Sequence, residues 1–232
     1  MRIAGLQKLS LLDFPGHVSC TVFTGGCNFR CPFCHNASLV LPEQLADEPD
    51  REREVLAFLK KRQGLLDGVA ITGGEPTLQK DLPDMARRIR ELGYDIKLDT
   101  NGLHPDVLGR MIREGLVQYV AMDIKNSPER YAQTAGLQKI DLSPIRESAA
   151  MLMEGSTEYE FRTTVVTELH DDDSFTGIGE WIRGARKYYL QKFTDRETVP
   201  FEGLHAPTRE QMKHWADVIR PYVPAVELRG VD

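Results

Sequence analysis

The strongest constraint on the fold is a repeating order of apolar strand, polar or glycine-rich turn and amphipathic helix along the 232 residues. Short β-branched and apolar runs predict the strands, and apolar residues at helical spacing predict the helices. About six such units follow one another, which predicts an α/β protein with a mainly parallel sheet and right-handed crossovers. The predicted strands cover residues 18–24, 69–72, 96–100, 119–125, 159–166 and 188–193, with a short further strand around 226–228.

The order of elements leaves two shapes open. Six units do not close the standard barrel of eight strands, so the sheet is either a partial, open barrel or a flat doubly wound sheet. Periodicity does not decide between these shapes. The polar motifs all fall at or near the carboxyl ends of predicted strands, which is the edge where parallel α/β folds place their sites.

Composition excludes some functions. The chain is 41% hydrophobic and 28% charged, with a net charge of −6 and a pI near 5.6, which argues against a nucleic-acid or anionic-membrane surface. No run of apolar residues is long enough to span a bilayer, and the first residues lack the apolar segment of a signal peptide. We therefore expect a cytoplasmic protein, in whose reducing compartment clustered cysteines bind metal more readily than they form disulfides.

Three of the four cysteines lie within eight residues of one loop, at Cys27, Cys31 and Cys34. Zinc is one candidate, although structural zinc usually takes four ligands and no second cysteine pair follows. A cubane iron–sulfur cluster takes one thiolate per iron, so three thiolates leave one iron open to a small molecule. The spacing favours the cluster, with zinc as the alternative. Cys20 lies in a predicted strand and is expected to be an ordinary buried residue.

Further polar motifs follow the next strands. Gly73-Gly74-Glu75 forms either a tight turn or a place where the backbone approaches a ligand closely. Asp99 and Asn101 follow the next strand and are also common turn residues. Asp123 and Lys125 are two residues apart, so they share one side of a strand that is otherwise apolar, where they must pair or bind a ligand. Arg162 can hold a carboxylate through two parallel hydrogen bonds.

Taken together, these motifs resemble the radical S-adenosylmethionine (SAM) enzymes. The cysteine spacing, with the aromatic Phe33 before Cys34, matches their signature. The ordered set is most similar to glycyl-radical-enzyme activating proteins, including those that act on pyruvate formate-lyase and on anaerobic ribonucleoside-triphosphate reductase. The resemblance implies that residues 1–232 form a single domain, an open (β/α)6 barrel. The matching segments are residues 13–16, 26–36, 72–76, 99–102, 123–125 and 162–166.

The resemblance also implies roles for individual residues. Cys27, Cys31 and Cys34 are expected to hold one [4Fe–4S] cluster, and Asp123 and Lys125 to lie near SAM and the glycine-bearing segment of a partner. In the implied reaction, an electron from a low-potential donor such as flavodoxin or ferredoxin cleaves SAM under anaerobic conditions. The resulting 5′-deoxyadenosyl radical takes a hydrogen atom from a glycine of the partner enzyme. The implied SAM contacts are Phe33, His35, Gly73, Gly74, Glu75, Asp99, Asn101 and Arg162.

One departure from the family pattern bears on the partner. The pyruvate formate-lyase activases carry Pro-aromatic-His on the last barrel strand, whereas residues 190–193 read Leu-Gln-Lys-Phe. This difference favours anaerobic ribonucleoside-triphosphate reductase as the glycyl radical enzyme. Two alternatives stay open, namely a radical SAM enzyme that acts on a small molecule such as a deazapurine precursor, and a non-catalytic zinc-binding α/β module. We expect residues 13–17 or 194–207 to form the rim where a partner docks.

Overall fold

A single curved sheet organises the chain, as seen in the computed structural model, which describes residues 1–41 and 51–231. The strands lie side by side in their order along the sequence, and β1 alone runs antiparallel to its neighbour. No pairing joins the first strand to the last within the described residues, so the predicted open barrel of mainly parallel strands is confirmed. The strands are β1 (Ile3–Ser10), β2 (Ser19–Thr24), β3 (Gly68–Gly73), β4 (Asp95–Thr100), β5 (Tyr119–Asp123), β6 (Glu158–Val165), β7 (Tyr188–Lys192) and β8 (Val226–Arg229).

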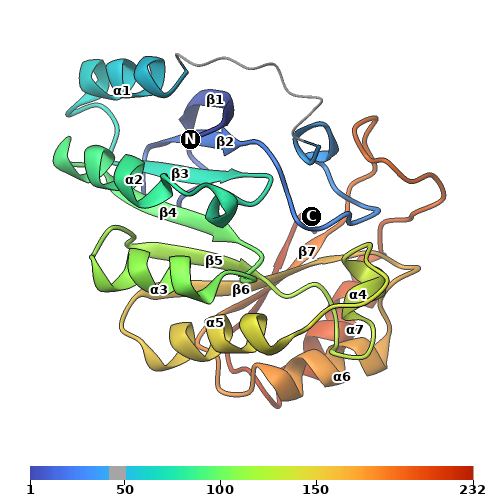
Figure 1. Ribbon diagram of the computed structural model, residues 1–232. Helices are drawn as coiled ribbons and strands as arrows, with labels where there is room; N and C mark the ends of the chain where they lie inside the picture. Colours follow the sequence, from blue (N-terminus) through green and yellow to red (C-terminus); the bar gives the residue numbers. More distant parts are fainter. Residues whose placement is uncertain (42–50, 232) are drawn as a thin grey trace.

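The helices follow one another along the outer side of this sheet, and long loops gather where the strands end (Figure 1). Two helices begin with a capping box. In this motif the side chain of the N-cap residue accepts a hydrogen bond from the backbone N–H three residues later, and the side chain of that later residue accepts one from the backbone N–H of the N-cap residue. Asp171 with Ser174 opens α6, and Thr208 with Gln211 opens α7. The helices are α1 (Arg51–Arg62), α2 (Leu82–Glu91), α3 (Pro105–Arg113), α4 (Tyr131–Thr134), α5 (Ser143–Glu154), α6 (Asp172–Trp181) and α7 (Arg209–Ile219), with short 3-10 turns η1 (Ala37–Leu39) and η3 (Pro76–Leu78).

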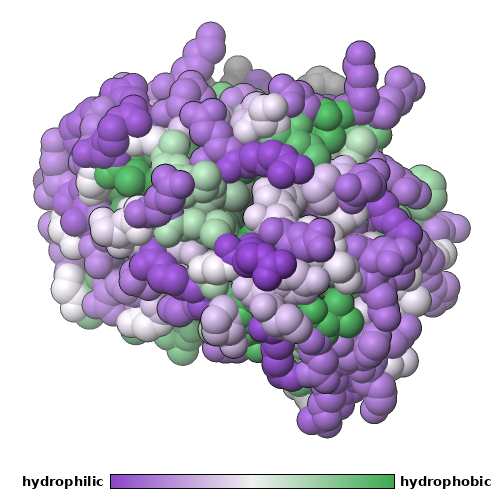
Figure 2. Space-filling model, turned by 90° about the horizontal axis from the view of Figure 1, so that it is seen from below, coloured by the Kyte–Doolittle hydropathy of each residue, from purple (hydrophilic) through white to green (hydrophobic). Residues whose placement is uncertain are grey.

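The two faces of the sheet differ in polarity because side chains alternate along each strand. On β4, Ile96 and Leu98 are fully buried on one face, whereas Lys97 and Asp99 lie on the other. The apolar face packs against the helices and forms the core, and the inner face carries charge. The surface turned downward in Figure 1 is mostly hydrophilic, with small separate hydrophobic areas (Figure 2). No helix of the described ranges is long and apolar enough to cross a membrane.

The hairpin of β1 and β2 was not expected from the sequence. Its register pairs Ser10 with Ser19, so the loop between the strands lies at the amino end of β2, opposite the cysteine loop. There Phe14 is almost fully buried and stacks on His17, with 3.8 Å between the ring centroids. Asp13 nonetheless accepts a hydrogen bond from the Thr21 hydroxyl and lines the site pocket, and docking of a partner at residues 13–17 stays a prediction. Residues 194–207 follow β7 and lie at the same edge as the cysteines.

Candidate active site

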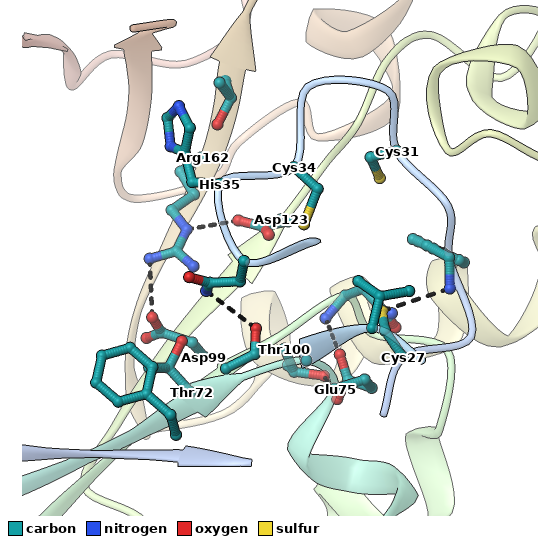
Figure 3. A pocket seen from close by; sticks show the side chains of 18 of the residues that line it. Cys27, Cys31, Cys34, His35, Thr72, Glu75, Asp99, Thr100, Asp123 and Arg162 are labelled. Carbon is teal, nitrogen blue, oxygen red and sulfur yellow. Dashed lines mark hydrogen bonds and ion pairs between the residues drawn. The ribbon is translucent and has the colours of Figure 1, made fainter. Parts of the chain in front are cut away.

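The inner face of the sheet and the loop after β2 enclose a pocket of about 330 Å³ at the carboxyl edge of the strands (Figure 3). Parallel strands bring their carboxyl ends to one edge, so residues far apart in the sequence meet there. All thirteen residues that the sequence predicted for the site line this one pocket. They are Cys27, Cys31, Phe33, Cys34, His35, Gly73, Gly74, Glu75, Asp99, Asn101, Asp123, Lys125 and Arg162.

Backbone hydrogen bonds to other segments hold the cysteine loop in place. The Gly26 N–H donates to Leu39 O at 2.7 Å, and the Arg30 N–H donates to Ala135 O at 2.9 Å. Burial raises the pKa of Cys27 to about 12 and that of Cys31 to about 11, and it also raises the pKa of Cys34. The metal-free loop therefore holds neutral thiols, and a metal must displace their protons. Cys20 lies in the core, as expected.

The arrangement of the thiols distinguishes two kinds of metal centre. Within residues 1–41 and 51–231, no three His, Cys, Asp or Glu side chains converge as ligands of one ion. A structural zinc ion requires several ligands that converge on one point. A cubane takes each thiolate on a different iron, so it requires only that the thiols face a shared space, as these three do. The Phe29 N–H also donates to Cys27 Sγ at 3.4 Å, a contact of the kind that tunes iron–sulfur centres. The residues present fit a cubane cluster.

Gly73 and Gly74 join β3 to the cysteine loop. The Gly74 N–H donates to Thr24 O at 2.8 Å, and the Glu75 N–H donates to Gly26 O at 2.8 Å. A Cβ at Gly74 would lie 2.0 Å from Gly26 O, which no real Cβ tolerates. Gly73 also has a φ of +113°, a conformation that favours glycine. The glycines therefore allow two backbones to touch, whether or not they also contact a ligand.

We predict that Gly74→Ala displaces the cysteine loop, because the added methyl group collides with the backbone just before Cys27. The variant should bind much less iron after anaerobic reconstitution and should unfold at a lower temperature. Iron analysis and a thermal melt measure both effects. Gly5→Ala is the matched control, because its Cβ meets only ordinary contacts at 3.6 Å and beyond. Full iron loading of Gly74→Ala would show that the close approach is not needed.

Glu75 connects the same turn to β4. Its carboxylate is 1% exposed and accepts hydrogen bonds from the Thr77 N–H and hydroxyl, the Thr100 hydroxyl and the Asn101 N–H. Burial raises the pKa of Glu75 even though these donors favour its charged form. Each carboxylate oxygen thus already has a partner in the protein, which makes Glu75 an organiser of the turn.

A ladder of alternating charges crosses the inner face from β4 to β6. Asp99 pairs with Lys97 and, at 3.2 Å, with Arg162. Arg162 also donates to Asp123 (Figure 3). Asp123 Oδ2 in turn lies 2.8 Å from Lys125 Nζ. Burial opposes the ionisation of Asp123, but Arg162 and then Lys125 outweigh it and hold the pKa of Asp123 well below its usual range. Arg162 therefore pairs with two carboxylates of the protein, and its hold on a ligand carboxylate stays a prediction.

His35 ties the cysteine loop to the segment after β7. Its Nε2 lies 2.7 Å from Thr194 O, and its ring stacks on Phe193 at 5.7 Å between centroids. Phe33 is 4% exposed and faces Lys125, whose Nζ lies 6.0 Å from the ring centroid. The two loops at the mouth of the pocket are thus in direct contact.

The polar residues in or beside the pocket that sequence reasoning missed include Thr164, Gln191, Lys97 and Asn28. Thr164 and Gln191 line it. Lys97 is 3% exposed and pairs with Asp99, and its place between Ile96 and Leu98 was a usable signal for an inner-face charge. Asn28 accepts a hydrogen bond from Asn101 Nδ2 at 2.7 Å, a contact between loops that no local pattern indicates.

The chain is similar to known proteins over most of its length. The family model described as the radical SAM superfamily matches residues 21–174. A protein of Methanocaldococcus jannaschii, named as a glycyl-radical enzyme activating enzyme, is 28% identical over 99% of this chain and 96% of its own. Among solved structures, a domain of a pyruvate-formate lyase-activating enzyme from Bacteroides vulgatus has a TM-score of 0.58 at 16% identity, covering 71% of this chain and 99% of that one.

A second solved structure, Streptococcus suis SuiB bound to S-adenosylmethionine, has a TM-score of 0.64 at 13% identity. The match covers 88% of this chain and 48% of SuiB, and at this identity it shows the shared fold alone. The match to the family model spans more than half of the chain, so the alternative of a non-catalytic zinc-binding module is given up. The chain belongs to the radical SAM superfamily, whose enzymes work with a [4Fe–4S] cluster and S-adenosylmethionine.

Proposed function

We propose that this protein is an activating enzyme that installs a glycyl radical on a partner enzyme. The observation that carries the proposal is the similarity to the Methanocaldococcus jannaschii protein of that name, which extends over nearly the whole of both chains. The partner that we propose is anaerobic ribonucleoside-triphosphate reductase, because residues 190–193 lack the histidine of the pyruvate formate-lyase activases. We further propose that residues 1–232 act as one domain in the cytoplasm and receive electrons from a flavodoxin or ferredoxin.

In this proposal, Cys27, Cys31 and Cys34 hold the cluster, which is supported by three free thiols that face one pocket. When bound, the cluster and SAM supply radical chemistry, in which a 5′-deoxyadenosyl radical takes a hydrogen atom from a glycine Cα. Asp123 and Lys125 lie beside the site of this transfer and keep the pocket wall rigid through their ion pair. The residues proposed to bind and orient SAM are Phe33, His35, Gly73, Gly74, Glu75, Asp99, Asn101 and Arg162.

Anaerobic reconstitution tests the proposal. The protein should take up iron and sulfide, cleave SAM to 5′-deoxyadenosine when reduced, and generate a glycyl radical signal in electron paramagnetic resonance spectra of the reductase. The control is the same reductase with its radical-bearing glycine replaced by alanine, which should give no such signal. Strong stimulation of SAM cleavage by a small molecule, with no radical on the reductase, would instead support the small-molecule alternative.

A further inference from the structure

The main chain that carries Asp123 and Lys125 into the pocket runs past the end of the ladder between β5 and β6. The last register pair joins Asp123 to Arg162, and the Ile124 N–H still donates to Arg162 O at 2.9 Å. Asp123 and Lys125 line the pocket, whereas Ile124 is fully buried. The carbonyl groups of a buried backbone need hydrogen-bond donors, and beyond a ladder these donors have to come from other parts of the chain.

Three side chains supply one contact to each of these consecutive carbonyl groups. All three are at most 3% exposed, and none is among the described residues that line the pocket. They come from α4, from β6 and from the loop after β6, so they hold the segment from different elements. We refer to them as the carbonyl clasp. The contacts are Tyr131 Oη to Asp123 O at 3.4 Å, Thr163 Oγ1 to Ile124 O at 2.5 Å, and His170 Nε2 to Lys125 O at 3.0 Å.

Two members of the clasp are themselves fixed by a second hydrogen bond. Thr163 Oγ1 accepts from the Tyr188 hydroxyl at 2.6 Å. Burial lowers the pKa of His170, which keeps the ring neutral. Its Nδ1 accepts from the Val166 N–H at 3.2 Å, so the proton is on Nε2 and is donated to Lys125 O. The donors of the clasp are therefore held in place before any ligand binds.

The third member connects the segment to the cysteine loop. The Tyr131 ring meets the ring of Phe29 edge-on, with 6.3 Å between the centroids. On the pocket side, Lys125 Nζ lies 6.0 Å from the centroid of Phe33, which belongs to the same loop. The clasp thus fixes the main chain of Asp123 and Lys125 relative to the loop that carries the thiols.

We propose that the carbonyl clasp positions Asp123 and Lys125, so that their charged groups face the reacting groups in the pocket. The proposal rests on the roles proposed above for these two side chains and assigns the residues that support them. A carboxylate and an ammonium two residues apart on one backbone move together, so donors to that backbone position both. A small displacement of such groups can lower a rate far more than it lowers stability.

A double-mutant cycle on the reconstituted full-length enzyme tests the proposal, with anaerobic ribonucleoside-triphosphate reductase present and 5′-deoxyadenosine formation as the measured rate. His170→Leu should lower kcat about tenfold, as a small misplacement of Lys125 would, with iron content unchanged. Lys125→Met should lower kcat by itself. In that background His170→Leu should cause no further loss, because the ring acts through Lys125. His170→Gln, which can still donate to Lys125 O, should recover most of the rate.

Thr163→Val is a second, nearly isosteric variant that removes the donor to Ile124 O, and it should lower kcat in the same way. Tyr94→Phe is the matched control, because Tyr94 is 2% exposed and its hydroxyl donates to Leu59 O at 2.7 Å away from the pocket. This control should lower the melting temperature about as much as Thr163→Val does and should leave kcat unchanged.

Losses that multiply in the double variant would overturn the inference, because the clasp would then act on the fold as a whole. An unchanged kcat in Lys125→Met, or in both His170→Leu and Thr163→Val, would overturn it as well. If the wild type cleaves SAM but places no radical on the reductase, the proposed function fails, and the cycle is still read from 5′-deoxyadenosine. If the wild type does not cleave SAM at all, both fail together.

Discussion

Replacing Cys31 by alanine should abolish cluster binding and reduce SAM cleavage to background while the fold remains intact. Cys31 lies between the other two thiols of the loop, and two thiolates cannot hold a cubane that has three protein ligands. The backbone of the loop is anchored independently, through Gly26 and Arg30, so the side chain is not needed for the path of the chain. Iron and sulfide analysis, 5′-deoxyadenosine formation and circular dichroism measure the three expected results.

Cys20→Ala is the control for this experiment. Cys20 is fully buried in the core on β2 and does not line the pocket. Its loss should cost about 1 kcal/mol of folding stability through the small cavity left behind, with iron content unchanged. Loss of helical circular dichroism in Cys31→Ala alone would indicate that the metal supports the fold itself, and normal iron loading would remove Cys31 from the ligand set.

Asp123→Asn should impair both stability and turnover. The change leaves Lys125 and Arg162 in the pocket wall without the carboxylate that joins them. Removal of one partner from a buried ion pair costs about 3–5 kcal/mol, and we expect the lower end because these side chains are 15–24% exposed. A displaced wall also misplaces bound groups, which can lower the rate of glycyl radical formation roughly a hundredfold. Urea denaturation and the rate of radical formation measure the two effects.

The stability difference between wild type and Asp123→Asn should depend on pH, and its direction follows from the sign of the pKa shift of Asp123. The pKa of Asp123 is lower in the folded protein than in the unfolded chain, so its contribution is complete above the unfolded pKa of about 4 and is lost as the pH falls further. The stability gap between wild type and Asp123→Asn should be constant from about pH 5 to 8 and should shrink below about pH 4. A gap that widens on acidification would contradict the pairing.

Asp217→Asn is the matched control, because Asp217 is 63% exposed and pairs with Arg220 on the surface. It should change the free energy of unfolding by less than about 1 kcal/mol, as exposed ion pairs do. A comparable loss in both variants would show that the ladder contributes no more than a surface pair.

Much of the site could be predicted because its residues follow strands directly. Gly73, Asp99 and Asp123 stand at the last positions of β3, β4 and β5, or one residue before, and the sheet aligns these ends automatically. Arg162 could be placed on the same face from its strand alone. The β1 hairpin was missed because its sequence, IAGLQKLS, lacks the apolar alternation of a half-buried strand.

No strand pattern could predict which polar side chains pair with one another in the folded protein. Whether Arg162 holds a ligand or two carboxylates of the protein depends on Asp99, 63 residues away, and on Asp123, 39 residues away. Thr164 and Gln191 are likewise ordinary strand residues until the register of β6 and β7 places them side by side on one wall of the pocket.

The sequence by itself determined the chemical inventory: three thiols on one loop, a glycine turn, and charges at successive strand ends, all at the edge where a parallel sheet collects them. Only the tertiary structure decided which of these side chains pair with one another in the pocket wall and which face the ligand. The reason is physical. Local pattern sets which face a side chain occupies, whereas pairing depends on distances across the curved sheet, and these exist only once the strands have come together.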